Sequence, residues 1–131
     1  MTESTTELFN NFKEALNDYT ANAFGIGMYM TAYKTLNDET KEQYKNHIRK
    51  NIKEEIELDK SLKEYAIALV DDYNVFREIL NAIESLRKNS YDAGRAYYRN
   101  DTKEEYERLQ SVFIEDHDAF INYMKKELEN A

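Results

Sequence analysis

The sequence predicts an all-α fold, an antiparallel bundle of three to four long helices, and three observations support this prediction. The 131 residues include no proline and only three glycines, so few residues would interrupt a helix. Apolar residues recur at every third or fourth position, and no segment shows the two-residue alternation of a strand. At four points Ser or Thr is followed three residues later by Glu or Gln, a spacing typical of helix N-termini. These capping boxes are Ser4 with Glu7, Thr40 with Gln43, Ser61 with Glu64, and Thr102 with Glu105.

The first predicted helix spans residues 5–36 and carries one continuous apolar stripe. In steps of three and four residues, the stripe comprises Leu8, Phe12, Leu16, Tyr19, Ala23, Ile26, Met30 and Tyr33. Asn37 and Asp38 then predict a turn. The second predicted helix, 40–58, has a thinner stripe formed by Tyr44, Ile48, Ile52 and Ile56.

The third predicted helix, 61–88, has the richest apolar stripe. Its members are Leu62, Tyr65, Ala66, Leu69, Tyr73, Phe76, Leu80, Ile83 and Leu86. Only Asp59 and Lys60 separate it from the second helix, so the alternative is a single long, kinked helix.

Asn89-Ser90 predicts a further boundary, followed by a short helix at 91–99. Asn100-Asp101 then separates this segment from a fourth long helix at 102–129. The apolar stripe of that last helix comprises Leu109, Phe113, His117, Phe120, Met124 and Leu128.

Length and charge narrow the range of functions. A chain of 131 residues fits a single domain, 1–131. The formal net charge of −8 argues against direct binding to nucleic acid or to anionic membranes, because both attract basic proteins. No apolar segment approaches the roughly 20 residues that span a bilayer, and no signal peptide is visible at the N-terminus. We therefore expect a cytoplasmic protein.

The residues that usually carry catalysis or bind metals are scarce. The chain has no cysteine, which excludes disulfides, a thiolate nucleophile and cysteine metal ligands. Neither His47 nor His117 follows a glutamate by three residues, as a di-iron bundle site requires. Paired acids such as Glu54-Glu55 and Asp71-Asp72 are typical of solvated helix faces. We expect no catalytic residue, no metal, no cofactor and no enzymatic activity.

Gly25 and Gly27 lie inside the first predicted helix, where each costs about 1 kcal/mol relative to alanine. Small residues allow a second helix to approach closely, either within the chain or from another molecule. Large apolar side chains around the pair make this half of the helix apolar on all sides. Two interpretations stay open, tight internal packing and a homodimer interface formed by Phe24, Gly25, Met28 and Tyr29.

Tyrosine is unusually abundant, with eleven tyrosines and no tryptophan. A cluster of tyrosine and arginine falls in a segment without a clear apolar stripe, and both residue types are enriched at protein-binding hot spots. The cluster comprises Tyr91, Arg95, Tyr97, Tyr98 and Arg99. It predicts either a recognition surface or rings packed over a helix junction.

The C-terminal third of the chain is acidic. A row of carboxylates can imitate the phosphates of nucleic acid, so an acidic helix face predicts a basic partner groove. The residues that we assign to this face are Glu104, Glu105, Glu115 and Asp118. A merely solvated face is the alternative.

Together these features favour a non-catalytic, protein-binding helical domain. Its most concrete form is a small acidic inhibitor or accessory factor, encoded by a phage or mobile element, that acts on a nucleic-acid-handling enzyme. The first alternative is a self-associating structural or immunity-type bundle. The second is a bundle that binds a small ligand or a metal between its helices.

Overall fold

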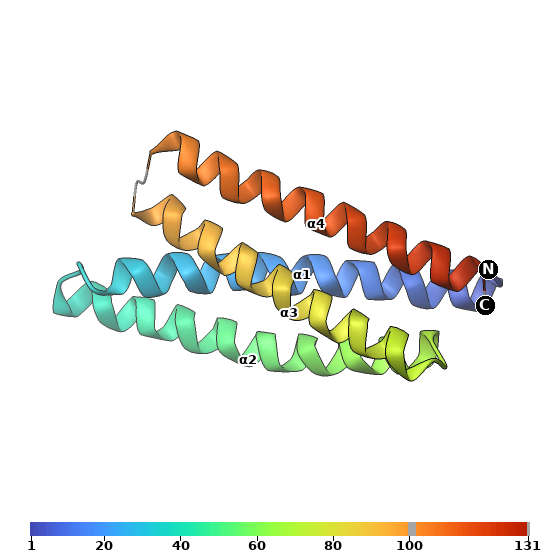
Figure 1. The fold of residues 1–131 in the computed structure, drawn as a ribbon. Coiled ribbons are helices and arrows are strands. Elements are labelled where there is room, and N and C mark those ends of the chain that lie inside the picture. Colours follow the sequence, from blue (N-terminus) through green and yellow to red (C-terminus); the bar gives the residue numbers. More distant parts are fainter. Residues whose placement is uncertain (100–101, 131) are drawn as a thin grey trace.

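The computed structural model describes residues 1–99 and 102–130, and these residues form four long helices. The helices are α1 (Glu3–Tyr33), α2 (Asp38–Leu69), α3 (Tyr73–Tyr98) and α4 (Lys103–Glu129). Each helix runs opposite to the one before it, so α1 and α3 point in the same direction (Figure 1). The described residues contain no strand, and none of their helices is long and apolar enough to cross a membrane. The predicted all-α bundle is confirmed.

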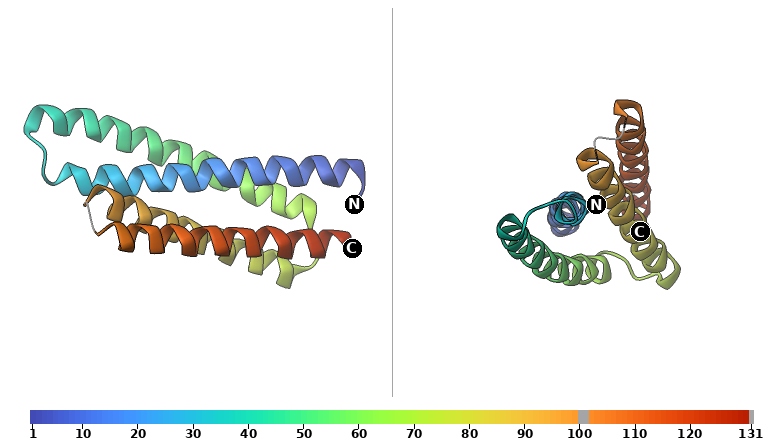
Figure 2. Two further views of the ribbon diagram at one scale, coloured as in Figure 1. Left: turned by 90° about the horizontal axis from the view of Figure 1, so that it is seen from above. Right: turned by 90° about the vertical axis from the view of Figure 1, so that its left-hand side faces the viewer.

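Helix α1 lies at the centre of the arrangement. It packs along most of its length against both α2 and α3, whereas α4 packs mainly against α3. Figure 2 shows α2 on one side of α1, with α3 and α4 on the other. The rings of Phe12 and Phe120, 6.1 Å apart, join α1 to α4. Around them lies the main core, whose fully buried large side chains include Phe12, Leu16, Leu62, Ile79, Leu86 and Met124.

Two of the predicted helix starts are wrong by two or three residues. Thr2 rather than Ser4 is the N-cap of α1, and its side chain accepts a hydrogen bond from the backbone N–H of Thr5. Asn37 rather than Thr40 is the N-cap of α2, and it accepts from the N–H of Thr40. Both caps have the extended backbone that a cap residue requires, whereas Ser4 and Thr40 already lie inside their helices.

The predicted start of the last helix is at the right residue. Thr102 is the N-cap of α4, although its side chain makes no capping hydrogen bond, so the box with Glu105 does not form. The predicted boundary at Asn100-Asp101 lies outside the described residues.

At Asp59-Lys60 the predicted interruption is wrong and the alternative, a helix continuous through these residues, is correct, because α2 continues through them without a break. The capping box at Ser61 with Glu64 is therefore in mid-helix. The chain instead breaks at 70–72, where Asp72 caps α3 by accepting from the N–H groups of Asn74 and Val75. Asp71-Asp72, which the sequence suggests is part of a solvated helix face, therefore includes the N-cap of α3.

The predicted boundary at Asn89-Ser90 is also wrong, and residues 91–98 are the last part of α3 rather than a separate short helix. Ser90 is buried, and its hydroxyl donates to the backbone carbonyl of Thr20, 2.6 Å away. A residue that suggested a helix end is instead a contact between α3 and α1.

The apolar stripe predicted for the second helix is wrong beyond Ile48. Ile52 and Ile56 are 42% and 65% exposed, respectively. Successive steps of four residues advance about 400°, so a stripe made only of such steps turns about 40° further around the helix each time. The buried side of α2 instead continues from Ile48 to Leu62 and Ala66.

The break at 70–72 also changes the alignment of α3. Tyr73, assigned to the third stripe, is 69% exposed, whereas Ile79, outside that stripe, is completely buried. Because α3 starts afresh at Tyr73, it does not keep the rotational phase of the residues before the break.

Candidate protein-binding surface

Helices α1 and α3 cross with their backbones in contact. A Cβ atom on Gly27 would overlap the carbonyl oxygen of Tyr91, and one on Gly94 would overlap the carbonyl oxygen of Phe24. Only glycine fits at either position without moving a helix. Gly27 therefore serves packing within the chain, and its partner Gly94 was not singled out by the sequence.

The residues predicted as a homodimer seam are all partly buried against other helices of the same chain. Gly25 faces the side chain of Asn51 in α2. The ring of Tyr29 stacks on His47, with centroids 5.2 Å apart, and the backbone of Met28 approaches α3. Phe24 packs against Tyr97, described below. Internal packing accounts for Gly27, and a dimer through Phe24, Gly25, Met28 and Tyr29 stays a prediction.

Three aromatic rings from three helices meet beside this crossing. The Tyr97 ring of α3 lies 5.9 Å from Phe24 of α1 and 5.3 Å from Tyr106 of α4. Phe24 and Tyr106 are 6.5 Å apart, which completes a cluster that we call the aromatic triad. Tyr97 is nevertheless 55% exposed. The triad therefore presents a large ring that is packed on one side and exposed on the other.

The rest of the predicted tyrosine and arginine cluster surrounds the end of α3. The Arg95 guanidinium lies 5.9 Å from the centre of the Tyr91 ring, a cation–π distance. Tyr98 is 36% exposed, and Arg99 occupies the C-cap position of α3. Tyr91 and Arg95 thus form a pair of their own, and Tyr97 alone belongs to the triad.

A groove of about 560 Å³ opens next to the triad between α1, α3 and α4. Phe24 and Tyr106 line it together with Phe113, and Ile114, 56% exposed, stands at its edge. Its remaining lining residues are Asn17, Thr20, Ala21, Ser90, Ala93 and Gln110. The groove lies along the first half of α4, where none of the described residues is buried.

The acidic residues of α4 have different surroundings. Glu104, Glu115 and Asp118 are exposed, and their spacing of eleven and three residues places them within about 60° on one side of the helix. Glu105 instead accepts two hydrogen bonds from Arg108, and this contact lowers the pKa of the Glu105 carboxyl. Three of the four predicted acids therefore form a common face, and the charge of Glu105 is balanced locally.

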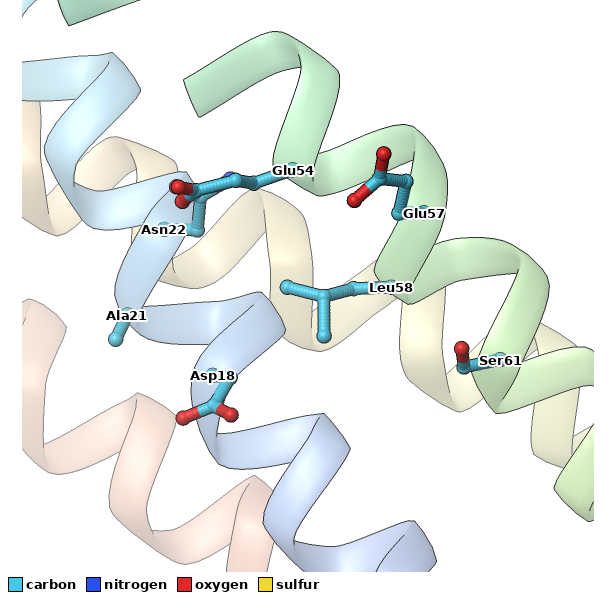
Figure 3. A pocket seen from close by; sticks show the side chains of 7 residues that line it. All are labelled: Asp18, Ala21, Asn22, Glu54, Glu57, Leu58 and Ser61. Carbon is cyan, nitrogen blue, oxygen red and sulfur yellow. The ribbon is translucent and has the colours of Figure 1, made fainter. Parts of the chain in front are cut away.

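A second groove, between α1 and α2, is acidic. Figure 3 shows Glu54 of α2 reaching towards Asn22 of α1, Leu58 pointing into the space between the two helices, and Asp18 further along α1. The carboxylate of Glu57 points away from that of Asp18, so the acids do not converge as a general acid and base would. Within residues 1–99 and 102–130, no group of three or more His, Cys, Asp or Glu side chains could hold a metal ion.

Comparison with known proteins adds no relative. No protein-family model, curated protein or solved structure matches the chain.

Proposed function

We propose that the chain is a non-catalytic protein-binding domain, and that the aromatic triad with its groove is the contact surface. Its most concrete form is a small acidic inhibitor or accessory factor of a nucleic-acid-handling enzyme, encoded by a phage or mobile element. The observation that carries the proposal is Tyr97, which is more than half exposed although two other rings hold it in place.

A ring held in this way suits binding for an energetic reason. Immobilising a flexible side chain on binding costs about 0.5–1.5 kcal/mol, and a ring already packed on one side has lost part of that freedom. Tyrosine also offers a large apolar area and a hydroxyl at its tip, which is why it is enriched at hot spots. The adjoining groove, lined by Phe24, Phe113 and Ile114, has room for an apolar side chain of the partner.

The charge of α4 indicates the kind of partner. Glu104, Glu115 and Asp118 are exposed on α4, on the side of that helix opposite Tyr106 and Phe113 of the groove, so they act on a partner from a distance rather than inside the groove. Exposed carboxylates attract a basic surface and accelerate its approach. Enzymes that bind nucleic acid present basic surfaces of this kind, because they must neutralise phosphates.

The proposal can be tested by photo-crosslinking from two tyrosine positions. Benzoylphenylalanine replaces Tyr97 in one variant and Tyr73 in the other, which is the matched control because Tyr73 is 69% exposed but belongs to no ring cluster. We expect the Tyr97 position to crosslink a basic nucleic-acid enzyme, and the purified domain to inhibit or modify that enzyme. Equal adducts from both positions, or an enzyme indifferent to the domain, would overturn the proposal.

A self-associating bundle is the second candidate function. The observation that favours it is a set of exposed isoleucines on α2, on the other side of the molecule from α4 (Figure 2).

A further inference from the structure

Helix α2 carries an apolar stripe that no other helix of the chain covers. Ile52, Ile56 and Ile67 are 42%, 65% and 64% exposed. Their spacing of four and eleven residues places them within about 60° on one side of the helix, over a length of about 22 Å. We call this set the isoleucine stripe. Isolated exposed apolar residues are ordinary, but three aligned on one helix face form a contact surface.

The charges beside the isoleucine stripe are mostly basic, although the protein as a whole is acidic. The exposed basic side chains on and next to it are Arg49, Lys53, Lys60 and Lys63. Asp59, at its middle, pairs with Lys63 at 2.8 Å. Of the other acids in this part of α2, Glu55 bonds Arg87 of α3, and Glu54 and Glu57 line the groove towards α1. Glu64 is exposed one turn from Lys60, so the basic side chains still outnumber the acidic ones beside the stripe. The stripe therefore fits an occupant that brings negative charge.

The C-terminal end of α2 is acidic, in contrast to the basic segment around Arg49. Its C-terminal turn contains no basic residue, and Asp71 and Asp72 follow it directly, both exposed. The carbonyl groups at a helix C-terminus add about half a negative charge. The acidic end of one α2 helix therefore complements the basic residues around Arg49 on another α2 helix that runs in the opposite direction.

We infer that a second copy of this chain covers the isoleucine stripe, with the two α2 helices antiparallel about a two-fold axis between Asp59 and Lys60. This register places Ile52 opposite Ile67 of the partner subunit, and the two-fold axis repeats this contact at the other end of the stripe. It also places Asp59 opposite Lys60 of the partner subunit.

Further contacts in this register also match. Ile56 meets Lys63 of the partner subunit, whose aliphatic stem can cover it. Arg49 comes near Asp71 of the partner subunit, beside the end of that helix. When two copies of the stripe run in opposite directions, complementary residues thus lie opposite each other. A symmetric dimer requires such self-complementarity. This surface is separate from both the aromatic triad and the residues around Met28, so the inference does not depend on the triad as a binding surface, and it rests on the second candidate function, the self-associating bundle.

Cysteine crosslinking tests the register directly, because the chain has no cysteine of its own. Ile52→Cys protein is mixed with Ile67→Cys protein and oxidised mildly. We expect the mixed disulfide to exceed either homotypic disulfide at least about fivefold. Ile114→Cys is the matched control, since that isoleucine is 56% exposed but lies on α4. Predominant homotypic Ile52→Cys dimers, or equal crosslinking to the control, would contradict the antiparallel register.

Sedimentation equilibrium tests the dimer without any disulfide. Wild-type protein should form dimers as its concentration rises, and Ile56→Lys should weaken them at least about tenfold, because the introduced positive charge would face Lys63 of the partner subunit. Ile114→Lys should leave them unchanged, and circular dichroism checks that both variants are folded. The inference is wrong if wild-type protein remains monomeric at about 1 mM. The inference is also wrong if the isoleucine stripe binds phosphatidylserine vesicles instead of a second copy, because the stripe would then be a lipid-binding surface.

Discussion

Gly27 of α1 and Gly94 of α3 lie at one helix crossing, and each leaves room only for the backbone of the other helix. This crossing fixes the end of α3 against α1. It thereby sets where Tyr97 meets Phe24, so the geometry of the candidate surface depends on two residues that have no side chain.

The crossing predicts a large difference between two glycines that are two residues apart. Gly27→Ala should destabilise the protein by about 1–3 kcal/mol, the usual cost of overpacking, because its Cβ would meet backbone that cannot yield. Gly25→Ala should be neutral or stabilising by up to about 1 kcal/mol, since its nearest neighbour is the movable Asn51 side chain and alanine favours helix. Urea unfolding followed by circular dichroism measures both. Equal losses from the two changes would show that the crossing is not as tight as described.

The break between α2 and α3 predicts which polar residue matters for capping. Asp72→Ala should cost about 1 kcal/mol, because the Asp72 carboxylate accepts from two backbone N–H groups at the start of α3. Ser61→Ala should be neutral, since Ser61 lies in mid-helix. Thermal or urea unfolding distinguishes them, and a greater loss from Ser61→Ala would restore the helix boundary that the sequence suggested.

Stability should fall in strong alkali because of Tyr19. Burial raises the pKa of its phenol from 10.0 to about 12, and the nearby carboxylates of Asp59 and Glu55 add to the effect. The unfolded chain loses this proton first, so the contribution of Tyr19 is complete below pH 10 and is lost as the pH rises towards 12. Tyr19→Phe should therefore lose less stability than wild type over this range. Identical pH profiles for the two proteins would refute the assignment.

The acidic face and the arginine next to the triad should affect different rate constants with the captured enzyme. Changing Glu104, Glu115 and Asp118 to lysine should slow association and weaken its salt dependence, because exposed charges mainly steer the encounter. Arg95→Ala should instead act on dissociation. Surface plasmon resonance at several salt concentrations separates the two effects. Association unaffected by the triple change would leave the acidic face as merely solvated.

The sequence predicted the fold class well, because three-to-four-residue periodicity and the lack of breakers act throughout the chain. It predicted helix boundaries poorly wherever a pair of polar residues was compatible with two structures. Asn89-Ser90 looked like a helix end, but a serine hydroxyl can also bond a carbonyl of a neighbouring helix. Asp71-Asp72 looked like a helix face, although it ends one helix and caps the next.

Only part of the candidate surface could be predicted from the sequence. The tyrosine and arginine cluster was found from its composition, and its exposure at Tyr97 and Tyr98 fits a recognition surface. The contribution of Phe24 and Tyr106 could not be found, since they lie 73 and nine residues from Tyr97 and meet it only through tertiary packing. The exposure of Ile56 follows from the rotation of successive four-residue steps around α2.

The dissociation rate of the complex with the captured enzyme tests the central claim most directly. Tyr97→Ala should raise that rate at least about tenfold, while Tyr73→Ala, which removes an even more exposed ring at the start of α3, should leave it within about twofold. Circular dichroism on both variants checks that the helices persist. If Tyr97 is a central contact, only Tyr97→Ala shortens the lifetime of the complex. Equal dissociation rates for the two variants would contradict that role.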